Sequence, residues 1–279
     1  MLTITETDLQ NFRNYLAELE RSDATISKYI HDARVLMEFA PEGIDGQAHL
    51  TGFRPWLEAK NLCASSINSM FGAVNQFLAF LGSGLRLRYI KVQRQTFIPA
   101  DRELTRKEYE NLVAAAKRQG DKRLTLLVQT LCAVGLRVSE LRFITVESLR
   151  CGVAEIDNKG KKRVIQIPKS LASQLKPYCV RRGIASGPVF ITRTGNPMDR
   201  SNIWKMLKKL AETAKVAAKK VFPHNLRHLF ARTHYKKFKN LAGLADLLGH
   251  SSINTTRIYT ATSGKEERRQ LDSLGFVLG

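Results

Sequence analysis

Residues 124–142 read LTLLVQTLCAVGLRVSELR, and this stretch decides how the second half of the chain folds. Its first part is apolar enough to form a buried helix, and Gly135 is a typical helix stop. Arg137 is therefore expected just past the turn at the end of a buried helix, which is an unusual place for a side chain that is merely solvated. A second interpretation stays open, in which Arg137 forms a surface ion pair with Glu140 worth about 0–1 kcal/mol.

Upstream of this stretch, a basic segment without helical period divides the chain. Before it, apolar residues at helical spacing predict four short helices, and Thr5 with Asp8 has the pattern of a capping box. After it, Thr105 with Glu108 forms the same pattern at the start of the next helix. We therefore expect a helical bundle over residues 1–98, a linker over 99–104 and a second domain over 105–279.

Downstream, residues 153–167 leave the helical period and place the polar string NKGKKR between two apolar runs, which predicts a β-hairpin. A short strand over Pro188–Ile191 is expected to join it. From Asp199 to about Gly249 the helical pattern returns, with a break at Phe222 and Pro223. The predicted fold class is mainly α with a small β-hairpin or sheet, built as an N-terminal helical bundle and a mixed α/β second domain.

The formal net charge is +20, from 45 Lys and Arg against 25 Asp and Glu, and it indicates a polyanionic partner such as nucleic acid. Residues 1–100 hold 10 basic and 10 acidic side chains, whereas residues 101–279 hold 35 and 15. The second domain should therefore provide the main grip on that partner. No apolar stretch reaches the ~18–20 residues of a membrane span and the N-terminus lacks a secretion signal, so a soluble cytoplasmic protein is expected.

The predicted hairpin ends in a dense run of basic residues, Lys159 to Arg163. One interpretation is a solvated charge run. The other is a lysine that enters an anionic site from a flexible turn, where desolvation lowers its pKa and prepares it to donate a proton. Lys161 and Lys162 compete with Lys159 for that role, because a shift of two residues in a strand keeps the same face.

The string PHNLRH, residues 223–228, places His224 and Arg227 on one helix face near the helix N-terminus, where a phosphate binds readily. A metal site on His224 and His228 is disfavoured. A zinc helix of the HExxH kind has glutamate where this chain has Asn225, and Arg227 would repel a cation.

The string LLGHSSINTTRIYT, residues 247–260, puts His250 in a turn between two helices and Tyr259 nine residues later. Taken alone, Tyr259 is most often a packing residue. Together with the other motifs, however, the set contains two arginines, one lysine, two histidines and one tyrosine, with no acid cluster for Mg²⁺ and no glycine-rich nucleotide loop. Such a set suits attack on a phosphodiester by a side-chain nucleophile, with neither metal nor cofactor.

In this order, GLRVSEL, the hairpin lysine, HNLRHLFA and LLGHSSINTTRIYT resemble the motifs of the tyrosine recombinase (phage integrase) family over most of residues 105–262. The size and two-domain plan resemble its Xer-like members. The resemblance implies a site-specific DNA recombinase that integrates, excises or resolves DNA through a 3′-phosphotyrosine intermediate. It implies these roles: Tyr259 as nucleophile, Arg137 and Arg227 as phosphate ligands, Lys159 as general acid, His224 as base or donor for the tyrosine, His250 as phosphate donor, and Glu140 as positioning residue.

The resemblance further implies a SAM-like core-binding bundle that clamps double-stranded DNA together with the catalytic domain, a tetramer on paired sites, accessory directionality proteins and a nucleoid location. The tail after Tyr259 packs either on its own domain or on a neighbouring subunit. Two alternatives share the scaffold: a type IB topoisomerase-like relaxase and a catalytically silent DNA-binding protein. Further DNA contacts are predicted at local basic side chains, namely Lys28, Arg86, Arg88, Lys91, Lys161 and Lys162.

Overall fold

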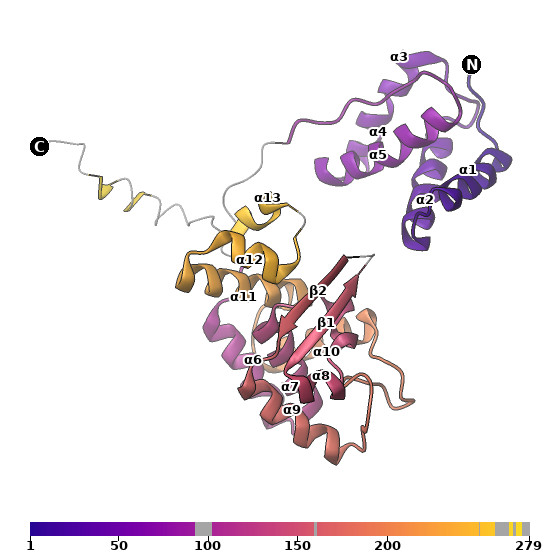
Figure 1. Ribbon diagram of the computed structural model, residues 1–279. Coiled ribbons are helices and arrows are strands. Elements are labelled where there is room, and N and C mark those ends of the chain that lie inside the picture. The colour runs from indigo at the N-terminus through magenta and orange to yellow at the C-terminus, as the bar shows by residue number, and fades with distance from the viewer. Residues whose placement is uncertain (93–101, 159–160, 251, 260–267, 270–271, 275–279) are drawn as a thin grey trace, which may run out of the picture. The chain divides into compact units, whose positions relative to one another are not determined.

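The computed structural model describes residues 1–92, 102–158, 161–250, 252–259, 268–269 and 272–274 (Figure 1). The chain forms two compact units, Met1–Arg94 and Gln95–Gly279. The first half of the predicted linker, residues 99–101, lies outside the described residues. Leu104, at the end of that predicted linker, is fully buried in the core of the second unit.

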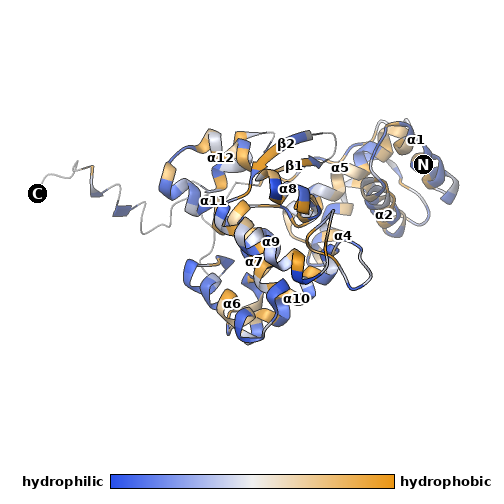
Figure 2. Ribbon diagram, turned by 60° about the horizontal axis from the view of Figure 1, so that its bottom comes forward, coloured by the Kyte–Doolittle hydropathy of each residue, from blue (hydrophilic) through white to orange (hydrophobic). Residues whose placement is uncertain are grey.

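The first unit contains five helices among its described residues, one more than predicted. Thr5 caps α1 with the expected capping box, and apolar residues at helical spacing are buried in α1, α2 and α5. The additional helix, α3, has six residues and buries only Leu50, so it shows no apolar period. Figure 2 shows hydrophilic and hydrophobic segments alternating along α1 and α2. The helices are α1 (Glu6–Glu18), α2 (Asp23–Phe39), α3 (Gly46–Thr51), α4 (Phe53–Ala59) and α5 (Ala64–Phe80).

After α5 the chain runs in an extended conformation that two asparagines of α5 hold in register. The side chain of Asn75 accepts from the Leu87 backbone N–H at 2.8 Å and donates to the Leu87 carbonyl at 3.0 Å. Asn68 makes the same pair of bonds with Ile90, at 2.8 and 2.9 Å. Leu87 is buried by this arrangement, whereas the basic side chains on either side of it point to solvent.

The described part of the second unit is mainly helical and contains one hairpin. Thr105 caps α6 through the expected capping box, and Asp121 caps α7. Two of its helices, α8 and α9, were not predicted from the sequence. Its elements are α6 (Arg106–Arg118), α7 (Lys122–Val134), η2 (Val138–Phe143), α8 (Val146–Cys151), β1 (Val153–Asn158), β2 (Lys161–Gln166), α9 (Lys169–Arg181), α10 (Arg200–Thr213), η3 (Ala218–Lys220), α11 (Pro223–Phe238), α12 (Leu241–Leu248), α13 (Ile253–Thr256) and η4 (Arg257–Tyr259).

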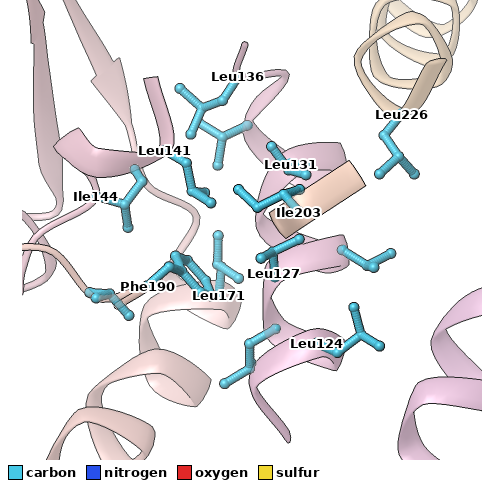
Figure 3. Packing of buried hydrophobic residues seen from close by; sticks show 14 of the residues in the cluster. Leu124, Leu127, Leu131, Leu136, Leu141, Ile144, Leu171, Phe190, Ile203 and Leu226 are labelled. Carbon is cyan, nitrogen blue, oxygen red and sulfur yellow. The ribbon is translucent and has the colours of Figure 1, made fainter. Parts of the chain in front are cut away.

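The core of this unit surrounds α7, as the long apolar run of the sequence predicts. Leu127 and Leu131 of α7 are fully buried, and Figure 3 shows them beside Leu171 of α9 and Ile203 of α10. At the end of α7, Gly135 adopts a left-handed conformation with φ of 64° and turns the chain toward Arg137. The core thus fixes the helix end from which the candidate site begins.

The predicted hairpin is confirmed, since β1 and β2 pair antiparallel with Ile156 opposite Arg163. Its tip, residues 159–160, lies outside the described residues. The predicted strand over Pro188–Ile191 is wrong: Pro188 and Ile191 form only isolated bridges, with Thr145 and Pro197. The N–H groups of Val146 and Val189 close the first bridge and those of Thr192 and Met198 close the second, and neither pairing continues into a strand.

No helix within the described part of the chain is long and apolar enough to cross a membrane.

Gly135→Ala should lower the free energy of unfolding of the second unit by more than the strain of an alanine in a left-handed conformation. An alanine Cβ at this position would lie 2.3 Å from Cδ1 of Phe230. Gly120 has a similar φ of 69°, and a Cβ added there would meet nothing within 4 Å, so Gly120→Ala is the matched control. We expect the control to lose about 1–2 kcal/mol and Gly135→Ala to lose about 1–3 kcal/mol more, measured by denaturant unfolding. Equal losses would contradict the close packing of α7 on α11.

Candidate active site

The centre of the candidate site is the carboxylate of Glu140, which is 1% exposed. The backbone N–H of Arg137 donates to its Oε2 at 2.8 Å, and Nη1 of Arg137 donates to its Oε1 at 2.8 Å. From β2, Nη2 of Arg163 donates to Oε2 at 2.7 Å. The interpretation of Arg137 and Glu140 as a surface pair is therefore wrong, because the carboxylate is buried and shared by two guanidinium groups.

Arg227 lies beside this carboxylate and is fully buried. Its Nη1 is 3.8 Å from Glu140 Oε2 and donates to the carbonyl of Gly135 at 2.8 Å, while its Nη2 donates to the carbonyl of Leu248 at 2.8 Å. These two carbonyls end α7 and α12, where the helix dipole is negative and favours a cation. Burial, and next the charge of Arg137, lower the pKa of Arg227 to about 10, which leaves it charged at neutral pH.

The orientation of His250 follows from its two hydrogen bonds. Nη2 of Arg227 lies 3.0 Å from Nε2 of His250, and arginine only donates, so Nε2 accepts. The proton of the neutral ring is then on Nδ1, which donates to Oγ1 of the buried Thr256 at 2.8 Å. Burial, followed by the charges of Arg227 and Arg137, lowers the pKa of His250 to about 4. In this arrangement neither ring nitrogen is available to donate to a phosphate.

Tyr259 lies at the end of the short helix η4 and is 3% exposed. It packs with Leu244 and Leu248 of α12. Its ring is stacked at 6.2 Å from the ring of His250, and its hydroxyl lies near the guanidinium group of Arg227. Burial raises the pKa of Tyr259, and the positive charge of Arg227 acts in the opposite direction. The phenol is therefore protonated at neutral pH and lies beside the cation that favours its ionised form.

Three aromatic rings form a row at this end of α11. The ring centroid of His228 is 5.0 Å from that of Tyr259 and 4.4 Å from that of His224, both in edge-to-face geometry. His224 is exposed at the start of α11, so His228 lies between it and the tyrosine. Burial, followed by the charge of His224, lowers the pKa of His228 to about 4.

The structure thus brings together Arg137, Glu140, Arg227, His250 and Tyr259, all of which the sequence analysis selected. His224 joins them by way of His228. Lys159 and the side chain of Lys161 lie outside the described residues, and Lys162 is exposed on β2.

The basic residues selected in the first unit differ in their surroundings. Arg86, Arg88 and Lys91 are exposed on the extended segment after α5. Lys28 instead donates to the buried carboxylate of Asp32 and to the carbonyl of Ser69 at 2.7 Å. Its ammonium joins α2 to α5, and we do not include it in a DNA-binding surface.

Two residues of the cluster were not selected from the sequence. The sequence marks Arg163 only as part of a charged hairpin tip, yet it lies on the same face of β2 as the buried Ile165, so the alternation of the strand was a usable signal. His228 was considered only as a metal ligand. Within the described ranges, no group of three or more His, Cys, Asp or Glu side chains could hold a metal ion.

Comparisons with known proteins identify the relatives of this chain. A model of the phage integrase family matches residues 102–266. The tyrosine recombinase XerA of Pyrococcus furiosus is 30% identical over 282 residues, which cover 97% of this chain and 94% of that protein. The tyrosine recombinase XerD of Vibrio cholerae is 29% identical over 262 residues, which cover 86% of each chain.

Solved structures share the fold at lower sequence identity. The XerH site-specific recombinase bound to a palindromic difH substrate, a post-cleavage complex, is 19% identical with a TM-score of 0.72, covering 89% of this chain and 79% of that one. Lambda integrase bound to DNA is 16% identical with a TM-score of 0.69, covering 89% of this chain and 92% of that one. The predicted fold class, mainly α with a small hairpin, is confirmed.

The lowered pKa values of His228 and His250 predict a loss of stability in mild acid. As pH falls below the ordinary histidine pKa of 6.5, the unfolded chain binds protons that the folded protein does not bind until about pH 4. The free energy of unfolding should therefore fall between about pH 6.5 and pH 4, and less steeply in His228→Asn. The exposed His31 is the control, and His31→Asn should leave the slope unchanged. Denaturant unfolding across this pH range tests the effect, and identical slopes in the parent and His228→Asn would contradict it.

Proposed function

The chain belongs to the phage integrase family of tyrosine recombinases, and on that premise we propose which of its residues perform each step. It is a recombinase that cleaves and rejoins DNA strands. The observation that carries our assignment is that Arg137 and Arg227 converge on the buried carboxylate of Glu140 and that Tyr259 lies beside Arg227.

Tyr259 is the nucleophile. Its Oη attacks the scissile phosphorus, an O–P bond to the tyrosine forms, and the bond from phosphorus to the 5′-oxygen breaks, which leaves a 3′-phosphotyrosine. The energy of the broken bond is kept in this linkage, so a 5′-hydroxyl from a second strand reverses the step and rejoins the DNA. Lys159 gives a proton to the leaving 5′-oxygen, because a sugar alkoxide is a strong base.

Arg137 and Arg227 bind the non-bridging oxygens and offset the charge that grows on them. The support for this role is electrostatic: two guanidinium groups lie beside a buried phenol in a region of low dielectric constant, where each charge acts more strongly than in water. Arg137 has the freer of the two groups, since its side chain is 36% exposed and its Nη2 lies 3.4 Å from the carbonyl of Gly249.

The phenolic proton leaves through the histidine row. His224 was predicted as a base or hydrogen-bond donor for the tyrosine, and His228 is a second candidate for the base because its ring is in direct contact with that of Tyr259. Both are neutral near pH 7. Partial desolvation and the charges of Arg227 and Arg137 lower the pKa of His224, and burial lowers the pKa of His228 to about 4. His250 orients Arg227 in the DNA-free protein, and donating to a phosphate requires its ring to release Arg227 first.

The first unit and the hairpin supply further DNA contacts, so that the two units grip one duplex. The exposed Arg86, Arg88 and Lys91 support this proposal, because the asparagine bonds of α5 hold their backbone in place. Lys161 and Lys162 extend the basic surface on the hairpin. We further propose assembly to a tetramer on paired sites, accessory proteins that choose direction and a location on the nucleoid.

Covalent capture tests the assignment of Tyr259. The protein is incubated in EDTA with fragmented, lightly nicked genomic DNA of its source, because a nick beside the cleavage position releases a short fragment and traps the adduct. We expect DNA bound covalently to residue 259, no adduct from Tyr259→Phe and unchanged DNA binding by that variant. Tyr235→Phe, in the same apolar cluster, is the control and should keep the adduct. An adduct mapped to another residue, or one abolished by EDTA, would overturn the mechanism.

The salt dependence of DNA binding tests the surface of the first unit. The logarithm of the affinity should fall with the logarithm of salt concentration by roughly 0.9 per phosphate contacted. Replacing Arg86, Arg88 and Lys91 together by alanine should make this slope shallower by about 2–3. Lys28→Ala should leave the slope unchanged, because the ammonium of Lys28 is already paired with Asp32 and the carbonyl of Ser69. A triple variant with the parent's slope would remove this segment from the DNA surface.

A further inference from the structure

Arg163 of β2 is the third guanidinium of the site, and no role in the reaction described above requires it. Its side chain is 13% exposed and donates from Nη2 to Oε2 of Glu140 at 2.7 Å. Two further nitrogens, Nε and Nη1, are buried without a hydrogen-bond partner among the described residues. A buried guanidinium group with unpaired N–H donors lowers the stability of the fold. Its presence here therefore suggests that it has a function in the site.

The fold accommodates Arg163 at Gly249. It occupies the inward face of β2 beside the buried Ile165 and opposite Ile156, where an apolar residue would be expected. A Cβ on Gly249 would lie 2.3 Å from its Nη1 and 2.7 Å from its Cδ. The backbone immediately before His250 therefore approaches the guanidinium as closely as only glycine permits.

The distances around Glu140 indicate what this placement achieves. Oε2 of Glu140 is 2.7 Å from Nη2 of Arg163 but 3.8 Å from Nη1 of Arg227. The carboxylate therefore accepts a hydrogen bond from Arg163, whereas Arg227 lies beyond hydrogen-bond distance. Three guanidinium groups face one carboxylate, which leaves the cluster with a net positive charge. Without Arg163, the same carboxylate would be balanced by the two arginines that bind the phosphate.

We propose that Arg163 is a positioning residue for DNA cleavage, which holds and neutralises the buried Glu140 carboxylate and so leaves the charges of Arg137 and Arg227 for the scissile phosphate. Glu140, fixed from the side of Arg163, orients Arg137 through its other oxygen, Oε1. Arg163 itself touches no reacting atom in this account. The inference rests on the proposed function of the two phosphate-binding arginines.

The test compares two substrates that differ only in the charge of the scissile group. One is a nicked duplex recovered by covalent capture, and the other has a methyl group in place of one non-bridging oxygen at the cleavage position. The methylphosphonate is neutral, so it needs much less help from the arginines. Single-turnover cleavage of both is measured with the parent protein, Arg163→Met and Arg163→Lys.

We expect Arg163→Met to cleave the phosphodiester slower than the parent by roughly tenfold or more. On the methylphosphonate, the cleavage rate of Arg163→Met should be within about threefold of the parent's rate. The charges of Arg137 and Arg227 matter less for this neutral substrate. Arg163→Lys should lie between the two, since it keeps a charge but not the planar fork. Both substrates are cleaved by the same folded fraction of each sample, so any loss of folded protein cancels in the comparison of the two deficits.

Arg232→Lys is the matched control. Arg232 is another largely buried arginine of this unit, but it pairs with Glu103 and donates to the carbonyl of Leu104 at 3.0 Å rather than to Glu140. Its variant should show the same deficit on both substrates. If Arg163→Met and Arg163→Lys cleave the phosphodiester at the parent's rate, or lose equally on both substrates, the inference is wrong. If the parent forms no adduct at all, the proposed function fails instead.

Discussion

One buried carboxylate among three guanidinium groups is the interaction on which the rest of this site depends. Glu140 is almost inaccessible to solvent, and an isolated charge there would be strongly unfavourable. Its partners come from separate parts of the second unit: Arg137 from the end of α7, Arg163 from the hairpin and Arg227 from α11. The ion pairs that neutralise this carboxylate therefore hold those three segments together. They also place a cluster of positive charge beside Tyr259.

The backbone also helps to build this centre, through carbonyl groups that bind Arg227 and through two glycines. Arg227 is held by the carbonyl groups of Gly135 and Leu248, which end two helices and carry partial negative charge. Gly135 and Gly249 both adopt left-handed conformations and both face a side chain that leaves no room for a Cβ. The glycines of the two motifs thus serve the close approach of α11 and β2 to the site, in addition to ending their helices.

Much of this arrangement was predictable, because local sequence patterns indicate the helices and most of the site residues. The capping boxes at Thr5 and Thr105 and the apolar run of α7 gave their helices, and the motifs gave five residues of the cluster. The short helix α3 was missed because it buries a single leucine, and Pro188–Ile191 was misread because apolar composition does not reveal whether a pairing partner exists. The alternation of β2 could have marked Arg163 as facing inward, but it does not reveal the partner. The contacts of Arg163 with Glu140 and of His228 with Tyr259 join residues distant in sequence, which only the fold brings together.

The central claim is that Tyr259 reaches a phosphate held by Arg137 and Arg227 while Glu140 stays bound to Arg163. A crystal structure of the protein with orthovanadate and two DNA fragments that end at the cleavage position tests it most directly, because vanadate adopts the five-coordinate geometry of the transferring phosphate. We expect vanadium bonded to Oη of Tyr259, with its equatorial oxygens on the guanidinium groups of Arg137 and Arg227. A vanadate bound by other cations, with the ring of Tyr259 still packed against α12, would contradict it.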